Sequence, residues 1–407
     1  MVRYNLQAGV FSEDRSIKWR GKNRIAGMCR NRKSLFAVLL ILCLLWGLRL
    51  FYADWSSRTF QWDSLGYYFY LPATFIYHDV AHLQWLPEVV HRYQLPGDFY
   101  QAHQDARSGN FVFFYTMGVA VMQAPFFFIG HFLAGLLHYP QDGFSAPYHW
   151  AVNAGLLLYI TLALFLLRRV LLHFFSDLTT SCVLLLVCLA TNFPQYTSVE
   201  AGMTHGYLFC LYCGMLFLCL RWQQKPSLTT TGLIGFLTGL AVLIRVTDVV
   251  ILFIPLFWGI TNRATMKRKW KIWTEDYRHF LVVAAGVFLA IAPQLFYWHL
   301  VSGRWIYPMG SKWDFLLPHW QVLLGWKKGW FIYTPVTIFM IAGLFRMKRK
   351  EYRNAVLIYF LLNVWIITAW HEWTYGASYS ARALVQALPV LCFPLGNLWD
   401  QGVKKDF

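Results

Sequence analysis

The chain has 407 residues, of which 57% are hydrophobic, 19% aromatic and only 14% charged. A soluble domain usually has about 25% charged residues, so this composition excludes a disordered chain and most soluble globular proteins. The net charge of +17 comes from basic residues that are spread over short segments. No long stretch alternates them with stacking side chains, so we expect no nucleic-acid partner.

The N-terminal third begins with a polar, basic segment over 1–33, which predicts a cytoplasmic tail. An apolar run over 34–51 predicts the first membrane span, with Arg49 snorkelling to the interface from its far end. The next stretch, 52–111, is the longest polar one. Its mixture of acids and aromatic residues is typical of interfacial helices, and we place it outside the membrane.

Ten further apolar runs follow, at about 112–137, 149–167, 179–194, 204–220, 228–245, 248–260, 280–299, 330–345, 354–370 and 383–398. If every run crosses the membrane, the chain has eleven spans. If 112–137 is a re-entrant or interfacial helix, ten spans remain, and 26 of the 36 Lys and Arg residues fall on the cytoplasmic side. The positive-inside rule favours this second arrangement.

We therefore predict an all-α polytopic membrane protein with about ten transmembrane helices and no large soluble domain. The membrane module covers 34–399, and 400–407 forms a cytoplasmic C-terminal tail. All eight cysteines lie in the basic N-terminal segment or in apolar runs, so we expect no disulfide framework. Cys210 and Cys213 form a C-x-x-C pair within an apolar run, where we expect packing and no redox or metal chemistry.

The outer loops hold the candidate functional residues, and the first is Asp63 in the sequence Trp62-Asp63-Ser64-Leu65-Gly66-Tyr67-Tyr68. A carboxylate in an aromatic segment at the membrane surface suits a general base that takes a proton from an attacking hydroxyl. The rings of Tyr67 and Tyr68 suit stacking on a sugar. The alternative is that Asp63 caps the N-terminus of a helix.

Two further pairs lie at the outer ends of later spans. Glu200 and His205 suit a hydrogen-bonded pair, or a metal pair that lacks a third ligand nearby. Arg245 and Asp248 lie between two apolar runs, either as an ion pair that holds a tight turn or with Arg245 facing an anionic head group.

The remaining candidates lie in the last third of the chain. Lys327 and Lys328 precede a span on the outer side, contrary to the positive-inside rule, and we interpret them as phosphate ligands; the alternative is interfacial anchoring. Glu372 follows His371, but residue 375 is Tyr, so the zinc-protease pattern is incomplete. Arg382 adds a cation at the membrane edge. Together, these cations and carboxylates suit a lipid phosphate and a hydroxyl acceptor.

These stretches resemble the GT-C superfamily of polytopic glycosyltransferases, in the bacterial group similar to protein O-mannosyltransferases and aminoarabinose transferases. The resemblance rests on four short stretches, namely Trp62–Tyr68, Tyr115–Pro125, Lys328–Pro335 and Trp373–Pro389. Many relatives have two adjacent acids at the first site, whereas here Ser64 follows Asp63.

The resemblance implies inverting transfer of a sugar from a polyprenyl-phosphate donor to a hydroxyl acceptor on a glycan, lipid or protein. The reaction would occur on the periplasmic face of the bacterial inner membrane, with membrane lipids and the lipid-linked sugar as partners. Asp63 would be the base. The lipid phosphate would be held by Lys327, Lys328, Arg382 and Arg245. The supporting or acceptor-binding residues would be Glu200, His205, Asp248, Glu372, Tyr67 and Tyr68.

We expect no cofactor and no obligatory metal, because cations alone can stabilise a phosphate leaving group. Some relatives do use a divalent ion. The competing interpretation is a lipid or small-molecule flippase that uses the same outer cavity without making bonds. Against it, the sequence shows no paired repeat and places its charges at the outer edge instead of the bilayer midplane. A membrane acyltransferase with a catalytic histidine is a third alternative.

Overall fold

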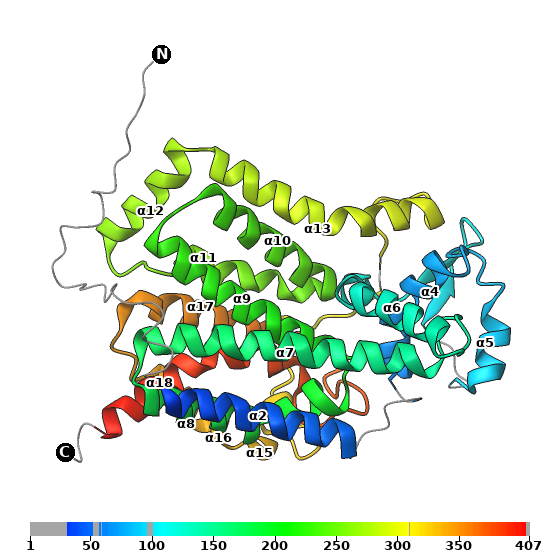
Figure 1. Ribbon diagram of the computed structural model, residues 1–407. Helices are drawn as coiled ribbons and strands as arrows, with labels where there is room; N and C mark the ends of the chain where they lie inside the picture. Colours follow the sequence, from blue (N-terminus) through cyan, green and yellow to red (C-terminus); the bar gives the residue numbers. More distant parts are fainter. Residues whose placement is uncertain (1–30, 52–56, 58, 96–100, 309, 404–407) are drawn as a thin grey trace.

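The computed structural model describes residues 31–51, 57, 59–95, 101–308 and 310–403 (Figure 1). The predicted tails, 1–33 and 400–407, lie largely outside the described residues. In the first half of the chain the elements are α2 (Arg32–Phe51), α3 (Trp62–Tyr68), α4 (Tyr70–Phe75), α5 (Leu86–Tyr93), β1 (Ala102–Gln104), β2 (Phe111–Phe113), α6 (Gly118–Leu136), α7 (Ala146–Phe174), α8 (Asp177–Leu189) and η1 (Gln195–Val199).

The second half continues with α9 (Thr204–Gln224), α10 (Leu228–Ile244), η2 (Val246–Leu252), α11 (Phe253–Phe257), α12 (Arg263–Glu275), α13 (Arg278–Ser302), α14 (Gln321–Leu324), α15 (Trp330–Tyr333), α16 (Val336–Leu344), α17 (Lys350–Ala369), η3 (Arg382–Ala387) and α18 (Leu388–Val403).

Six of these helices are long and apolar enough to cross a membrane: α2, α6, α7, α9, α13 and α17. Shorter apolar helices cover Asp177–Leu189, Leu228–Ile244 and Val246–Phe257. A mostly helical, membrane-associated protein is thus supported, but within the described residues the helices of spanning length number six, and the predicted ten are not confirmed. The run over 330–345 is divided because Pro335 separates α15 from α16. The run over 383–398 is divided between η3 and α18.

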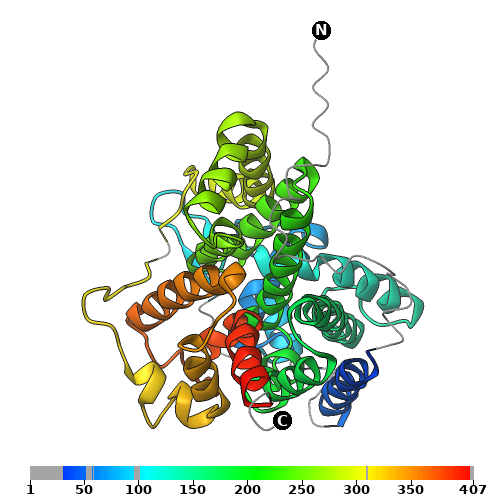
Figure 2. The same ribbon diagram turned by 90° about the vertical axis from the view of Figure 1, so that its left-hand side faces the viewer.

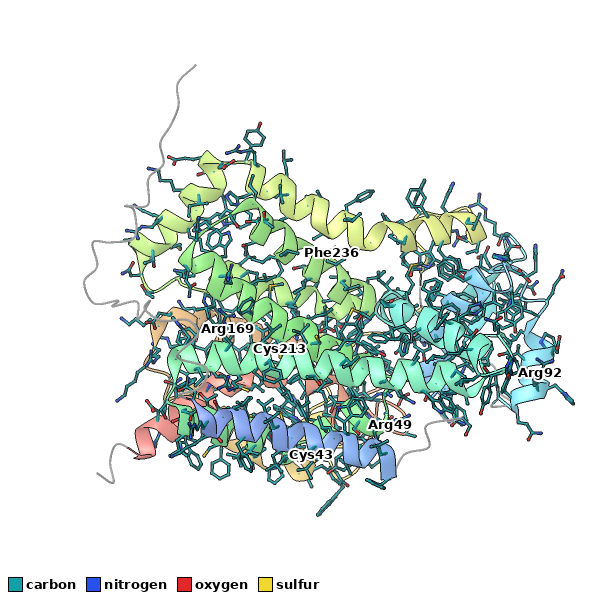
Figure 3. The ribbon with its side chains drawn as sticks, viewed as in Figure 1. Cys43, Arg49, Arg92, Arg169, Cys213 and Phe236 are labelled. Atoms are coloured by element: carbon teal, nitrogen blue, oxygen red, sulfur yellow. The ribbon has the colours of Figure 1, made fainter. Side chains whose placement is uncertain are left out.

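The relative orientation of helices α2, α6 and α7 concerns the segment 112–137, which the sequence predicts not to cross the membrane. Arg168, near the C-terminal end of α7, donates to the Ser34 hydroxyl at the start of α2 with a distance of 2.9 Å. Helices α2 and α7 therefore run in opposite directions, and Figure 3 shows Arg169 and Arg49 near opposite ends of α2. Helix α6 packs on the N-terminal half of α7, where Tyr159 donates to the carbonyl of Met122 at 2.9 Å.

Further along the same contact, a Cβ on Gly130 of α6 would lie 2.8 Å from Cα of Tyr148, which is near the start of α7. Helix α6 therefore packs antiparallel on one half of α7, and because α6 is also long and apolar enough to span a membrane, the non-crossing role of 112–137 stays a prediction.

The predicted interfacial segment 52–111 contains helices α3, α4 and α5, as expected, but it also holds the first strand of a small β-hairpin. Strand β1 pairs with β2 in antiparallel register, with Ala102 opposite Phe113 and Gln104 opposite Phe111. This short hairpin is an exception within a mostly helical chain, and the sequence-based prediction of interfacial helices did not include it. The reason is local, since the carboxylate of Asp105 accepts hydrogen bonds from the backbone of Arg107 and Ser108 and closes a short turn.

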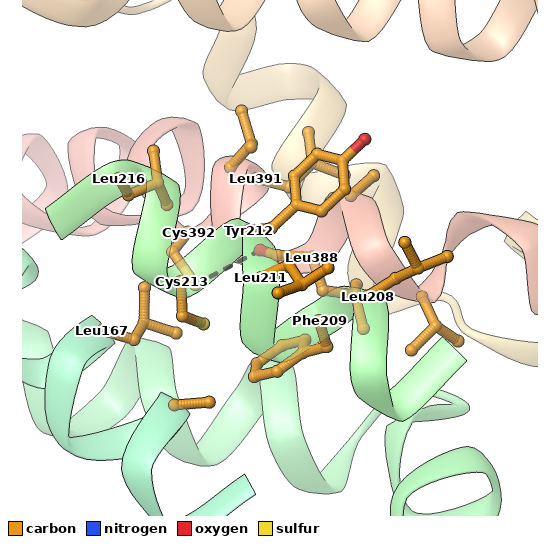
Figure 4. Close-up of a cluster of buried hydrophobic side chains, with 14 of the residues drawn as sticks. Leu167, Leu208, Phe209, Leu211, Tyr212, Cys213, Leu216, Leu388, Leu391 and Cys392 are labelled. Atoms are coloured by element: carbon orange, nitrogen blue, oxygen red, sulfur yellow. Dashed lines mark hydrogen bonds between the residues drawn. The ribbon is translucent and has the colours of Figure 1, made fainter. Parts of the chain in front are cut away.

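The packing is that of a membrane bundle. Buried apolar side chains from α7, α9 and α18 meet in its interior, among them Leu167, Phe209, Cys213 and Leu391 (Figure 4). Helices α10 and α13 lie side by side at one edge (Figures 1 and 2), where a Cβ on Gly235 would lie 2.4 Å from a carbonyl oxygen of α13. Small residues permit such close approach of helices in membranes.

Helix α13 exposes large apolar side chains along its length, including Phe280, Phe288, Leu289, Phe296 and Leu300. An exposed apolar face of this extent is typical of contact with lipid. The seven cysteines among the described residues are free thiols, and Cys210 and Cys213 are buried in the apolar interior, as expected for packing.

Candidate functional site

Asp63 is the second residue of the short helix α3, and both of its carboxylate oxygens are engaged. The Tyr115 hydroxyl donates to Oδ1 at 2.7 Å, and Nη2 of Arg382 donates to Oδ2 at 3.0 Å. These partners lie 52 and 319 residues further along the chain. The N-cap position of α3 is Gln61, so the alternative that Asp63 caps this helix is wrong.

Two glycines allow neighbouring segments to reach Asp63. A Cβ on Gly66 would lie 2.5 Å from the ring of Tyr115, and a Cβ on Gly202 would lie 2.4 Å from Cβ of Ser64. Real side chains do not tolerate such distances, so glycine is required at both positions for the present packing. Gly66 therefore permits the contact between Tyr115 and Asp63, and Gly202 brings the segment that carries Glu200 against α3.

Glu200 and Lys328 lie close enough to Arg382 to interact with it electrostatically. Gln195 in η1 donates to Oε1 of Glu200 at 2.7 Å. The ammonium of Lys328 donates to the backbone carbonyl of Ser378, in the loop that leads to Arg382. Burial, together with the charge of Arg382, holds the pKa of Lys328 below its usual value.

Tyr196 in η1 fixes the loop before Arg382 from the other side. Its hydroxyl donates to the Tyr379 carbonyl at 2.9 Å and accepts from the Tyr379 N–H at 2.8 Å. The loop is therefore held by η1 as well as by Lys328, which gives Arg382 a defined position against Asp63.

Arg245 and Asp248 extend the same site toward the interior. Arg245 lies close enough to Asp248, His205 and Tyr67 to interact with each of them electrostatically. The Tyr212 hydroxyl donates to Oδ1 of Asp248 at 2.8 Å. The expected turn between the two residues is present, because the N–H of Asp248 donates to the carbonyl of Arg245 at 2.8 Å.

His205 is buried at the start of α9, and Gln386 lies between it and Asp248. The amide of Gln386 and Nδ1 of His205 make no well-formed hydrogen bond to another described residue. Buried polar atoms normally have a partner in protein or water. These atoms therefore mark an interior that is suited to a polar ligand or to ordered water.

The electrostatic balance of this site follows from its charged members, namely Asp63, Glu200, Asp248, Arg245, Lys328 and Arg382. With Asp63 and Arg382 at its centre, we call this group the Asp63–Arg382 cluster. Three carboxylates face three cations, so the cluster is neutral when all are ionised. Burial raises the pKa of Glu200, and the nearby charge of Asp63 raises it further. Protonation of Glu200 leaves the cluster with one net positive charge.

Tyr67 is a neutral member of the same site. Burial, followed by the negative charge of Asp63, raises the pKa of its hydroxyl above the usual value, so the phenol stays protonated. It contributes a hydroxyl and an aromatic face near Asp63.

Three non-glycine residues beside the cluster have a left-handed backbone, Trp62 (φ 51°), Tyr375 (φ 53°) and Ser380 (φ 54°). Trp62 precedes Asp63, Tyr375 lies within electrostatic reach of Arg245, and Ser380 lies two residues before Arg382. Such conformations cost about 1–3 kcal/mol each and persist where the surrounding structure enforces them, often at functional sites.

Three predicted site residues lie elsewhere. The Tyr68 hydroxyl donates to the Gly143 carbonyl at 2.5 Å, and its ring stacks on Phe60 in a separate buried cluster. Its role is packing, and the predicted contact with an acceptor sugar is not supported. Lys327 is exposed, unlike its neighbour in the cluster, and the exposed Glu372 accepts a hydrogen bond from Thr374.

Arg49 also differs from its prediction, because it does not snorkel. Only 2% of Arg49 is exposed, and its guanidinium donates to the carbonyls of Ser198 and Val199 at 3.3 and 2.8 Å. It thereby anchors η1, the element that carries Tyr196 and Gln195.

Sequence reasoning did not single out four members of the site, namely Tyr115, Tyr196, Tyr375 and Gln386. A tyrosine or glutamine in an aromatic, apolar chain carries little local signal, so only their spatial positions identify them. Comparison of the sequence with protein-family models, with curated proteins and with solved structures gives no match. The function is therefore argued from the chemistry of the site alone.

Proposed function

We propose that the chain is an inverting glycosyltransferase that moves a sugar from a polyprenyl-phosphate donor to a hydroxyl acceptor at the Asp63–Arg382 cluster. One observation carries the proposal. The carboxylate of Asp63 lies between the Tyr115 hydroxyl and the Arg382 guanidinium, with Lys328 and Arg245 close by. A base beside several cations is the combination that hydroxyl activation and a phosphate leaving group require.

In the proposed reaction, the acceptor oxygen attacks C1 of the sugar from the face opposite the phosphate. The new O–C1 bond forms while the bond from C1 to the phosphate oxygen breaks, and the electron pair stays on the phosphate. The proton of the acceptor hydroxyl moves to the carboxylate of Asp63. The sugar is thereby inverted at C1 and polyprenyl phosphate is released.

The cations have separate tasks in this scheme. The bond from Arg382 to Asp63 uses one N–H of a guanidinium that has five. Arg382 can therefore pair with Asp63 and also contact the phosphate. Lys328 adds a second charge beside Arg382. A protonated Glu200 would remove one negative charge from the cluster, which would favour an anionic donor.

The proposed location is the outer leaflet of a bacterial inner membrane, with the cluster on the periplasmic side. The charge pattern of the sequence supports this orientation, since 26 of the 36 basic residues fall on the opposite side in the ten-span arrangement. Lipid carriers of this kind reach such a site by diffusion within the membrane.

The test uses the purified full chain in lipid vesicles, with a panel of synthetic polyprenyl-phosphate sugars and alcohol acceptors. We expect sugar transfer with release of polyprenyl phosphate, and a fall of at least about 100-fold in turnover for Asp63→Asn. The matched control is Asp276→Asn, because Asp276 also pairs with an arginine, Arg278, but lies outside the cluster.

The flippase alternative makes the opposite prediction in the same vesicles. Movement of the labelled lipid between leaflets with the sugar still attached, and no glycosylated product with any acceptor, would overturn the proposal. Normal turnover of Asp63→Asn would remove Asp63 as the base and direct the search to Glu200.

A further inference from the structure

A second group of functional side chains lies away from the Asp63–Arg382 cluster. Oδ2 of Asp314 lies 2.8 Å from Nε2 of His319 and 2.8 Å from Nδ1 of His371. One ligand atom from each residue lies within 4.8 Å of the other two. This is the one group of three or more potential metal ligands among residues 31–51, 57, 59–95, 101–308 and 310–403.

The three residues come from two segments that the backbone holds together. Asp314 and His319 lie in the segment after α13, and His371 directly follows α17. The N–H of Asp314 donates to the carbonyl of Ala369 at 2.6 Å. The N–H of His319 donates to the carbonyl of Thr368, also at 2.6 Å. Figure 2 shows the segment after α13 (yellow) on the outside of the bundle beside α17 (orange).

An antiparallel bridge between Trp313 and Trp370 completes this connection. Each tryptophan is the neighbour of a potential ligand, Asp314 in one segment and His371 in the other. The backbone positions of the ligands are therefore set by hydrogen bonds that do not involve their side chains. Preorganisation of this kind is what a metal site requires of its supporting structure.

We propose that Asp314, His319 and His371 bind one divalent transition-metal ion of the zinc type. Two imidazoles and one carboxylate are the donor set that zinc, cobalt, nickel and ferrous iron accept. Magnesium and calcium prefer oxygen ligands and do not match two histidines. The proposal stands independently of the glycosyltransferase proposal, because it uses none of the residues of the Asp63–Arg382 cluster.

The distances fit this assignment with small side-chain movements. Ligands at about 2.1 Å from one zinc ion lie at most about 4.2 Å apart. Both pairs that include Asp314 are already within that limit, and all three ligand atoms lie within 4.8 Å of one another.

The site is open on one side. The side chains of Asp314, His319 and His371 are 35%, 24% and 61% exposed. Three protein ligands leave at least one coordination position for water or another small ligand. His371 also begins the segment that ends at Arg382, so a bound metal would anchor one end of this segment to the chain after α13.

The experiment uses the purified full chain in detergent after removal of metals with a chelator. Zn²⁺ binding is measured by titration calorimetry, and Co²⁺ serves as the spectroscopic probe. We expect one Zn²⁺ per chain and a visible Co²⁺ absorption band of a site with nitrogen and oxygen ligands. Loss of a residue that only supports a metal ligand typically weakens metal binding by about 10–100-fold. His371→Ala removes a proposed ligand itself, so it should weaken Zn²⁺ binding by more than this.

The matched control is His91→Ala, because His91 is an exposed histidine at the end of α5 and lies outside the group. It should leave both the stoichiometry and the affinity unchanged. The wild-type titration decides the question even if a variant does not fold. Absence of saturable Zn²⁺ and Co²⁺ binding to the wild-type chain would overturn the proposal, as would binding that His319→Ala and His371→Ala leave intact.

Discussion

Asp63 and Arg382 are separated by 319 residues in the chain, yet their side chains form an ion pair of 3.0 Å in which both partners are more than four-fifths buried. Removal of one partner of a buried pair leaves an uncompensated charge and typically costs about 3–5 kcal/mol. Removal of both leaves no such charge. This asymmetry gives the first prediction.

Asp63→Asn and Arg382→Gln should each lower the unfolding temperature of the purified chain, and the double variant should lose less than the sum. We expect a coupling of about 1–3 kcal/mol between the two substitutions. The measurement is the thermal unfolding temperature of the wild type, the two single variants and the double variant, all in the same detergent. Strictly additive losses would show that the ion pair contributes nothing to the position of the loop before Arg382.

The two adjacent lysines are expected to behave differently. Lys328 interacts with Arg382 and Glu200, whereas Lys327 is exposed. Lys328→Gln should therefore weaken binding of a polyprenyl phosphate by about 10-fold or more, which corresponds to about 1.4 kcal/mol. Lys327→Gln is the matched control and should bind as the wild type does. Native mass spectrometry with added lipid measures both affinities, and equal losses would contradict this assignment.

Glu200 gives a prediction about pH. Because burial raises its pKa, the folded protein binds the proton of Glu200 more tightly than the unfolded chain does. Its contribution to stability is therefore most favourable at low pH and declines as pH rises above the ordinary value of 4.5 toward the raised value. Across the same window Glu200 gains a negative charge, so the affinity for an anionic donor should fall.

The measurement uses a non-hydrolysable phosphodiester donor analogue, because a phosphodiester has no second ionisation in this range. Its affinity should fall several-fold, on the order of 3–10-fold, as pH rises through the Glu200 pKa. Glu200→Gln should keep the tighter affinity throughout. The same pH dependence in Glu200→Gln would assign the titration to another group.

Gly66 provides a steric test of the contact between Tyr115 and Asp63. Its added Cβ would lie 2.5 Å from the Tyr115 ring, so Gly66→Ala should displace that ring and cost about 1–3 kcal/mol of stability. Turnover should fall as well, because Asp63 loses the hydroxyl that orients it. Gly47→Ala in α2 is the control, since no atom lies within 4 Å of the position of its Cβ. Wild-type stability and turnover in Gly66→Ala would contradict the proposed positioning.

Much of the candidate site was accessible from the sequence, because the cost of placing charge in lipid singles out charged residues at the ends of apolar runs. Asp63, Glu200, Arg245, Lys328 and Arg382 all lie near the ends of such runs, and they converge in the structure. The same argument could not separate Lys327 from Lys328, since adjacent residues share one local pattern. Which of two neighbours faces inward depends on the turn between α14 and α15.

Composition and hydropathy by themselves determined that this chain is a mostly helical protein with membrane-spanning character. Apolar runs of that length are stable in lipid, and a helix satisfies the backbone hydrogen bonds there. Only the tertiary structure decided how many runs form long helices, since breaks such as the one at Pro335 depend on packing around them. It also decided the partners of Asp63 and the meeting of Asp314, His319 and His371. Those contacts join segments far apart in the chain, and sequence periodicity reports only on neighbours within one element.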